Sequence, residues 1–487
     1  MTDTAKKGWM CERCGLRVYV SREDHEQNHK VRPVKPTTRE PRPKTRRPTR
    51  RRPAQPTEEP TAPIEINERF RAALDAIAAG KPIVLVTGGA GTGKSTFIKA
   101  LRQEMPAKNI VVLAPTGVAA LTAGGQTIHS FCRLPFKPIE VPQDIEAARD
   151  PKIVEKIDIV VVDEVSMVRA DILDGLECFL RINRNSKAPF GGVQMVLVGD
   201  PLQLPPVVRR EDEEVLRQRY GTAHFFRAAC LKGLSSLPVE LNKVYRQKDP
   251  HFKELLAHIR TAESAAEAVH AINEAAVGRD LHGPHLILVP TRAAAARENE
   301  KQLGALPGKT SSFTAAADGS FTKKTEENLP GHLQLVLKKG AQVMFTKNDP
   351  EGRWVNGSLG TVASITKSSV KVLMADGEKY EVQPVTWEDR RYSYDEKDAR
   401  IVQEVAGTFT QFPLMPAWAV TVHKAQGLTL AQVVVDLDRG AFAPGQVYVA
   451  LSRCVSLEGL SLRRPLRLHE VRCDPDALEF TRRIRRS

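Results

Sequence analysis

The stretch KPIVLVTGGAGTGKSTF, residues 81–97, decides the fold of this 487-residue chain. It begins with a short run of apolar, mostly β-branched residues, which is typical of a buried strand in a parallel sheet. The glycine-rich segment GGAGTGKST (88–96) follows, and a helical pattern comes directly after it. This order of strand, glycine-rich loop and helix is that of a phosphate-binding loop. The chain is therefore predicted to bind a nucleoside triphosphate in an α/β domain.

The loop gives several residues a predicted contact with the nucleotide. Glycines let backbone N–H groups approach the phosphates closely. Lys94 is expected to reach the β- and γ-phosphate oxygens, and the Ser95 hydroxyl is placed to bind Mg²⁺. The residues predicted to bind nucleotide in this loop are Gly88, Gly91, Gly93, Lys94, Ser95 and Thr96.

An acidic motif, VVVDEVSM (160–167), contains the end of another predicted buried strand. Asp163 is expected to hold Mg²⁺, and Glu164 to position and deprotonate the attacking water. An isolated Asp–Glu pair at a strand end can also be a solvated terminus. Together with a phosphate loop, however, the pair predicts hydrolysis of the bound triphosphate.

Short apolar runs bounded by turn residues recur after Ile64, in two sets. Such runs are typical of buried parallel strands, so two α/β domains are predicted. Residues 340–415 instead carry short strand patterns with glycine and aspartate turns, which predict a small β-barrel inserted into the second domain. The predicted strands are NIVVLAP (109–115), IDIVVVDE (157–164) and QMVLVGD (194–200), then HLILVPT (285–291), AVTVHKAQG (419–427) and QVVVDLD (432–438).

Excess positive charge restricts the class of partner. A net charge of +14 and a pI near 9.4 favour polyanions, with nucleic acid first among them. No apolar run approaches the ~20 residues that a membrane helix needs, and the start MTDTAKKGWM lacks the apolar core of a signal peptide. We therefore expect a multidomain cytoplasmic protein, associated with the nucleoid and without membrane contact.

Two pairs of metal-ligand residues lie near the N-terminus. Cys11 and Cys14, and then His25 and His29, have the spacing of zinc ligands. An odd number of cysteines, seven, without a signal peptide argues against a disulfide framework. We expect a structural Zn²⁺ here, with a surface cluster or a redox CxxC as the alternatives. The module is expected to bind nucleic acid or a protein partner.

Residues 31–63 form a predicted linker with nine prolines and ten basic side chains against three acidic ones. With almost no large apolar residues, this segment cannot form a packed core. It is interpreted as a solvated spacer, as a salt-sensitive arm that binds phosphates, or as both.

Seven segments, among them the one with the acidic motif, occur in an order that resembles superfamily 1B DNA helicases, above all the PIF-type and RecD/Dda-like enzymes. The resemblance covers about residues 64–465 and implies two RecA-like P-loop domains, the inserted barrel being SH3-like. It also implies ATP and Mg²⁺ as cofactors. The segments are LAPTGVAALTAGGQTIHSF (113–131), VVVDEVSMV (160–168), APFGGVQMVLVGDPLQLPPV (188–207), LNKVYRQ (241–247), WVNGSLGTV (354–362), AVTVHKAQGLTL (419–430) and GQVYVALSRC (445–454).

The resemblance also implies roles for single residues. Gln203 matches the glutamine that senses the γ-phosphate and links it to the DNA-binding surface. Arg246 and Arg453 match arginines that the second domain inserts toward the phosphates, where they would act only when the cleft is closed. The implied DNA-binding residues are Thr116, His129, Phe131, Thr421, His423, Lys424 and Gln426. Core packing is the alternative for His129 and Phe131, and helix capping or solvent exposure for His423 and Lys424.

The chain departs from the family pattern at Phe70. Within INERFRAALDAI (66–77), this residue stands where a glutamine that reads adenine is expected. An aromatic ring can stack on the base, so Phe70 is a predicted nucleotide contact. Discrimination of ATP from other triphosphates by hydrogen bonds is then in doubt.

The prediction is an ATP-dependent DNA helicase that acts on single-stranded DNA and forked duplexes and works as a monomer. Movement from 5′ to 3′ along the single strand is implied by the resemblance alone. Two alternatives stay open: an ATPase that remodels protein–DNA or RNA–DNA complexes, and a binding module in which ATP acts only as a switch. The predicted parts are a zinc module (1–30), a linker (31–63), domain 1 (64–240) with a wedge at about 132–157, domain 2 (241–339 and 416–470), the barrel (340–415) and a basic tail (471–487).

Overall fold

The computed structural model describes residues 9–10, 17–18, 65–438 and 440–486. Contacts divide the chain into Met1–Glu59 and Pro60–Ser487. Within Met1–Glu59, β1 (Trp9–Met10) pairs antiparallel with β2 (Arg17–Val18). The linker 31–63 lies outside the described residues. The four predicted zinc ligands, Cys11, Cys14, His25 and His29, lie outside them too.

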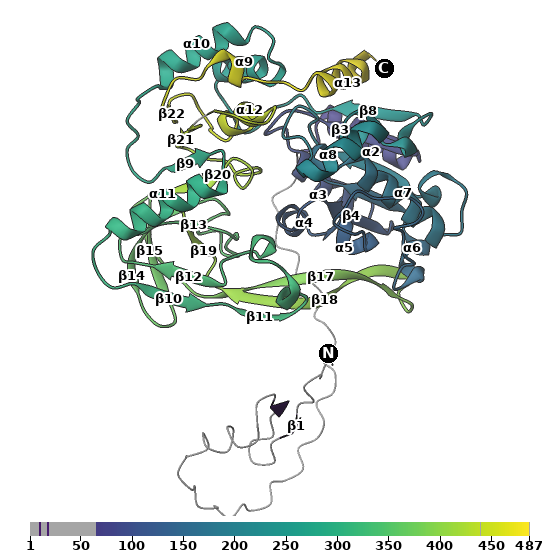
Figure 1. Ribbon diagram of the computed structural model, residues 1–487, viewed down its shortest axis with the longest axis horizontal. Helices are drawn as coiled ribbons and strands as arrows, with labels where there is room; N and C mark the ends of the chain where they lie inside the picture. The colour runs from purple at the N-terminus through teal and green to yellow at the C-terminus, as the bar shows by residue number, and fades with distance from the viewer. Residues whose placement is uncertain (1–8, 11–16, 19–64, 439, 487) are drawn as a thin grey trace, which may run out of the picture. The chain divides into compact units, whose positions relative to one another are not determined.

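A six-stranded parallel sheet carries the phosphate loop, in the order β5-β4-β6-β7-β3-β8 (Figure 1). Four of its strands are the apolar runs predicted from the sequence. The strands are β3 (Ile83–Thr87), β4 (Ile110–Ala114), β5 (Gln126–Thr127), β6 (Ile159–Val162), β7 (Gln194–Val198) and β8 (Ser236–Glu240).

Strand β3 shows why these runs are continuously apolar. Val84 and Val86 face the core under α2 (Glu68–Ala78) and α3 (Lys94–Glu104), while Ile83 and Leu85 face the core under α7 (Ala170–Asn183). Each buried side chain of this size contributes about 1.5–3 kcal/mol. The remaining helices of this part are α4 (Gly117–Thr122), α5 (Ile128–Cys132), α6 (Pro151–Lys156) and α8 (Arg210–Tyr220).

A second parallel sheet, in the order β20-β9-β21-β22, confirms the second α/β unit (Figure 1). Its strands are β9 (Leu286–Val289), β20 (Ala419–Thr421), β21 (Val433–Val435) and β22 (Leu460–Leu462). Its helices are α9 (Pro250–Thr261), α10 (Ala265–Ala276), α11 (Arg292–Ala305) and α12 (Gln446–Leu451).

The region predicted as a barrel is rich in strands and forms an antiparallel sheet in the order β16-β15-β14-β13-β19. This order ends in β16 and β19, so closure into an SH3-like barrel stays a prediction. The strands are β13 (Gln342–Phe345), β14 (Leu359–Ile365), β15 (Val370–Met374), β16 (Lys379–Val382) and β19 (Leu414–Pro416).

A long hairpin inside the same region belongs to another sheet. Strand β18 (Arg400–Gln411) pairs with β17 (Val385–Asp395) on one side and with β11 (Ala316–Gly319) on the other, while β10 (Ser311–Thr314) pairs with β12 (Gln334–Leu337). The hairpin reaches the first sheet (Figure 1), where the Val112 N–H donates to the Tyr392 hydroxyl at 2.8 Å. On the side of β4 that faces β5, only Leu113 and Ala114 are paired. Val112 therefore has no strand partner on that side.

The predicted basic tail forms helix α13 (Pro475–Arg486). The helix comes after the strands of the second sheet in the chain, but it packs on the α/β unit that contains the first sheet. Its Phe480 stacks on Phe226 with ring centroids 4.4 Å apart, and Ile484 packs against the core that includes α7. Helix α13 therefore ties the two α/β units together. In the part of the chain that the structure describes, the helices are too short or too polar to cross a membrane.

Candidate nucleotide and nucleic-acid site

The phosphate loop has the backbone conformation that its glycines predict. Gly91 and Gly93 have φ values of 76° and 90°, a region that side chains other than glycine rarely adopt. A Cβ atom added to Gly91 would also lie 2.6 Å from the Cβ of Arg246. Lys94 begins α3, and its Nζ donates to the carbonyls of Gly88 at 2.7 Å and Gly89 at 2.8 Å. The lysine is thus held beside the loop, while Ser95 and Thr96 are exposed in the first turn of α3.

The acidic pair lies at the end of β6, two strands from β3. Burial and the neighbouring Glu164 raise the pKa of Asp163 to about 7. Burial also raises the pKa of Glu164, against the opposing effect of Lys94 and Arg453. A divalent cation would offset the charge of this buried pair, and Mg²⁺ prefers one or two carboxylates together with phosphate and water oxygens. Ser95 and Asp163 fit such an ion, which would screen the charge on the phosphates.

Glu164 has a strained backbone, with φ at 49° in the left-handed region. For a residue other than glycine this conformation costs about 1–2 kcal/mol. Its N–H donates to Asp163 Oδ1 at 2.8 Å. A raised pKa makes the Glu164 carboxylate a stronger proton acceptor, which fits the base predicted for this residue.

Gln203 lies on the loop after β7 and is 6% exposed. Its Nε2 donates to Asp200 Oδ2 at 3.2 Å, and Asp200 is fully buried. Burial opposes the charge on Asp200, but Arg260 outweighs it and holds the pKa of this carboxyl below its usual range. Burial lowers the pKa of Lys94, while Asp200 and Glu164 counteract the effect. Gln203 is thus oriented by a carboxylate that also acts on the phosphate-loop lysine.

The second α/β unit brings two arginines to the phosphate loop. Arg246 donates from Nε to Thr429 Oγ1 at 3.0 Å and from Nη1 to the Ser452 carbonyl at 3.1 Å. Arg453 is 2% exposed, and burial and Arg246 lower its pKa to about 9, so it stays cationic at neutral pH. Both predicted arginines therefore lie at the seam between the two units.

Gln426 connects the two predicted functions. Its Nε2 donates to Glu164 Oε2 at 3.0 Å and lies 3.5 Å from Gln203 Oε1. It belongs to the segment that begins with Thr421, the last residue of β20, and continues through His423 and Lys424. A segment predicted to contact DNA therefore reaches the predicted base and the predicted γ-phosphate sensor.

Two of the predicted DNA contacts have a local structural task. Thr116 is exposed and caps α4, accepting from the Ala119 N–H at 3.2 Å. Thr421 is buried and accepts from the Lys424 N–H at 3.2 Å. Burial and Arg292 lower the pKa of His423. A neutral His423 would meet DNA as a hydrogen-bonding group rather than as a cation.

The aromatic residues near α5 divide into a packed one and an exposed one. Phe131 packs edge-on against Phe179 and Tyr392, which favours the core-packing alternative for this residue. His129 is stacked on Phe136, with centroids 4.9 Å apart and an interplanar angle of 9°. Phe136 is 73% exposed and lies inside the predicted wedge segment 132–157. Of the two phenylalanines, the one that presents a ring to solvent is Phe136.

The position of Phe70 contradicts the prediction that its ring stacks on the nucleotide base. It is 1% exposed and packs edge-on against Phe97, with centroids 5.7 Å apart. A ring buried under the phosphate loop has no free face for a base. Tyr245 is the exposed aromatic beside the loop, since its N–H donates to the Gly91 carbonyl at 2.9 Å and it is 40% exposed. The Asn67 amide donates to its hydroxyl at 3.0 Å.

Sequence reasoning missed four residues that the structure places at this site: Asp200, Tyr245, Arg260 and Tyr448. Asp200, Tyr245 and Tyr448 lie within the segments 188–207, 241–247 and 445–454, whose resemblance to helicase motifs was therefore a usable signal. Tyr448, on α12, accepts from the Ala90 N–H at 2.8 Å. Arg260 lies on α9 outside those segments, and no local pattern marks its contact with Asp200.

Comparisons with known proteins show which family the chain is similar to. The family model for PIF1-like helicase matches residues 64–267. "ATP-dependent DNA helicase Pif1" of Bdellovibrio bacteriovorus is 33% identical over 411 residues, covering 83% of this chain and 89% of that protein. "ATP-dependent DNA helicase PIF1" of Homo sapiens is 34% identical over 448 residues, covering 88% of this chain. The chain spans 65% of the length of this human relative.

Solved structures of a Bacteroides Pif1 give two different degrees of similarity. The complex with ADP-AlF4 has a TM-score of 0.79 at 34% identity, covering 87% of this chain and 98% of that one. The complex with single-stranded DNA has a TM-score of 0.64 at 34% identity, covering 86% and 97%. The described residues therefore match the nucleotide complex more closely than the DNA complex.

Replacing Phe70 with leucine tests its burial. We expect a loss of about 1 kcal/mol of stability, because the core accepts an apolar side chain of similar size. The KM for ATP should change less than about twofold. Thermal unfolding and ATPase kinetics measure the two quantities, with Phe97→Leu as the matched control. A tenfold rise in KM for Phe70→Leu alone would show that the ring contacts the base after all.

Proposed function

The chain belongs to the PIF1-like helicase family, and we propose that it is an ATP-dependent DNA helicase that moves 5′ to 3′ along single-stranded DNA. One observation carries the proposal: Gln426, in a segment suited to DNA, donates to Glu164 at 3.0 Å. A shift of that segment upon DNA binding would change the environment of the base. Hydrolysis and the grip on DNA are then coupled through one side chain.

The proposed chemistry uses the buried groups around the phosphate loop. Lys94 binds the β- and γ-phosphates, and Glu164 accepts a proton from the attacking water. Gln203 responds to the γ-phosphate. Arg246 and Arg453 stabilise the transferring phosphoryl group, since an arginine in a water-poor cleft interacts strongly with phosphate oxygens. A bound Mg²⁺, held by Ser95 and Asp163, would neutralise phosphate charge.

Tyr245 is the proposed platform for the nucleotide base. Its ring is exposed beside Gly93, and Lys243 Nζ lies 4.9 Å from the ring centroid. Stacking distinguishes bases poorly, because every base presents a π-face. The base selectivity of the enzyme is accordingly expected to be low.

The proposed DNA partners are single strands and forked duplexes. Thr116 and Thr421, with backbone N–H groups, suit phosphates, and His423 and Lys424 extend the track on the second unit. The His129–Phe136 stack would meet the first base pair of a fork. Two stacked planar side chains can replace the stacking that a separated base loses.

Other features of the proposal concern the whole protein. We propose that the enzyme acts as a monomer in the cytoplasm, associated with the nucleoid, in DNA repair or recombination. The N-terminal module would hold a structural Zn²⁺ and, with the basic linker, tether the motor to nucleic acid or to a protein partner. A tether of this kind raises the local concentration of the substrate.

Two partial duplexes of identical sequence test the central function. One carries a 5′ single-stranded tail and the other a 3′ tail. With ATP and Mg²⁺, strand separation is expected only from the 5′ tail, and a fluorophore–quencher pair on the two strands measures it.

Strand separation of the 3′-tailed duplex alone would show a helicase that moves 3′ to 5′, which contradicts the proposed polarity. If neither duplex opens while single-stranded DNA still stimulates hydrolysis, an ATPase that remodels complexes becomes the better account. The duplex should also stay closed with a non-hydrolysable ATP analogue.

Replacing Phe136 with alanine tests the strand-separating role of the aromatic stack. We expect the number of base pairs opened per ATP hydrolysed to fall about fivefold or more, since a base–aromatic stack is worth about 1–3 kcal/mol. The matched control is Phe442→Ala, which removes another phenylalanine that is 57% exposed. An unchanged ratio for Phe136→Ala would remove this residue from the proposed wedge.

A further inference from the structure

Asp200 is a fully buried carboxylate to which two different parts of the chain donate. From the first unit, Gln203 donates to Oδ2 at 3.2 Å and the Leu202 N–H to Oδ1 at 3.2 Å. From α9 of the second unit, Arg260 donates to Oδ1 at 2.7 Å and to Oδ2 at 3.1 Å. The same carboxylate therefore orients Gln203 and anchors a guanidinium from across the seam.

Arg260 is firmly attached to the second unit. It is 8% exposed, and the residue before it, Ile259, is part of the core under the second sheet. A bidentate arginine–carboxylate pair is short, directional and sensitive to small displacements. Any movement of the second unit that displaces α9 must therefore stretch the pair or move Asp200.

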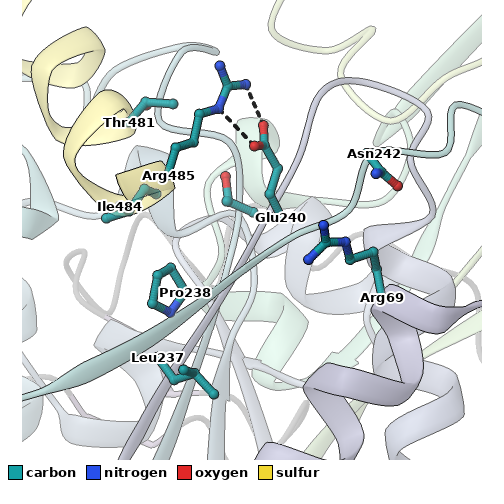
Figure 2. A pocket seen from close by; sticks show the side chains of 9 residues that line it. Arg69, Leu237, Pro238, Glu240, Asn242, Thr481, Ile484 and Arg485 are labelled. Carbon is teal, nitrogen blue, oxygen red and sulfur yellow. Dashed lines mark hydrogen bonds and ion pairs between the residues drawn. The ribbon is translucent and has the colours of Figure 1, made fainter. Parts of the chain in front are cut away.

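Helix α13 restrains Arg260 from its other side. Arg485 makes two hydrogen bonds to Glu240 at the end of β8, at 2.8 and 2.6 Å (Figure 2). Glu240 Oε1 also lies 3.9 Å from Arg260 Nη1. Arg482, one turn earlier on α13, pairs with Glu263 just after α9. The helix thus bridges the ends of β8 and α9.

Figure 2 shows the contact of α13 with the end of β8. The Arg485–Glu240 pair borders a cavity of about 280 Å³, and Ile484 and Pro238 line the same cavity. Because the Arg485–Glu240 pair is only partly enclosed, solvent weakens the attraction between its charges. It should therefore restrain the structure less than the buried Asp200–Arg260 pair does.

We infer that Arg260 is a positioning residue of the ATPase centre: through Asp200 it orients Gln203, so that docking of the second unit and sensing of the γ-phosphate occur together. This inference rests on the proposed function of Gln203. Helix α13 supports Arg260 through Glu240. The enzyme senses the γ-phosphate fully only when α9 is docked.

The loss of Arg260 has a defined chemical consequence. Without the guanidinium, burial raises the pKa of Asp200, and only Lys94, the Gln203 amide and the Leu202 N–H still favour its charged form. A protonated Asp200 becomes a donor at one oxygen, so it no longer offers two acceptors to Gln203 and the Leu202 N–H. Gln203 would then lose its fixed orientation.

The test compares two nucleotides that differ at the γ-phosphate position. The full-length chain is titrated with fluorescent ADP in the presence and absence of aluminium fluoride, with Mg²⁺, which gives the ratio of the two affinities. Binding of ADP counts the folded sites, so partial unfolding does not alter the ratio. Arg260→Met should lower the ratio about tenfold or more, and Arg260→Lys should fall between it and the wild type.

Arg464→Met is the matched control. It removes a guanidinium that makes two hydrogen bonds to Glu470, another buried carboxylate of the second unit, at 3.0 and 2.5 Å. If both methionine variants lower the ratio equally, or if neither does, Arg260 has no positioning role. Arg485→Ala should lower the ratio by a few fold and Arg486→Ala should not. Equal ratios for these two would overturn the role of α13.

A failure of the proposed function looks different. Wild-type protein that binds ADP but gains no affinity from aluminium fluoride has no γ-phosphate sensor, which overturns both the proposed role of Gln203 and this inference. A wild type that gains affinity, with Arg260→Met gaining as much, overturns the inference alone.

Discussion

The hydrogen bond from Gln426 to Glu164, at 3.0 Å, is the contact on which the rest of this structure depends. It requires the second parallel sheet to end opposite the first, so that the segment after β20 meets the end of β6. Tyr448 on Ala90 and Arg260 on Asp200 hold the two units in that arrangement. Each contact joins a group of the second unit to the phosphate loop or to a residue that controls it.

Burial gives these contacts their strength. Asp163, Asp200 and Arg453 are each at most 8% exposed, so charges interact across the seam with little screening by water. The same burial makes the loss of one charged residue strongly destabilising, because its partner is left buried and unpaired. The site is therefore expected to work as one unit: closure, phosphate and DNA each favour the same arrangement.

The sequence predicted what is encoded locally. The phosphate loop, its strand and the acidic pair each lie within a few residues, and the apolar runs of both sheets were recognisable because each is buried on two faces. Contacts between distant residues were not predicted. Arg260 reaches a carboxylate 60 positions away, and Tyr392 meets Val112 across 280 positions. The prediction for Phe70 is wrong because it follows from the family position of this residue and not from the face of the helix on which it lies. On α2 it is buried with Ala73, Leu74 and Ile77, which is the face that packs on α3.

A double-mutant cycle on Gln203 and Gln426 tests the coupling most directly. The quantity measured is the stimulation of kcat for ATP hydrolysis by single-stranded DNA, in the wild type, Gln203→Ala, Gln426→Ala and the double variant. If the two side chains act through one connection, the double variant loses little more than the worse single variant, with a coupling energy of about 1 kcal/mol or more. Independent, additive losses, or full stimulation in Gln426→Ala, would contradict the account.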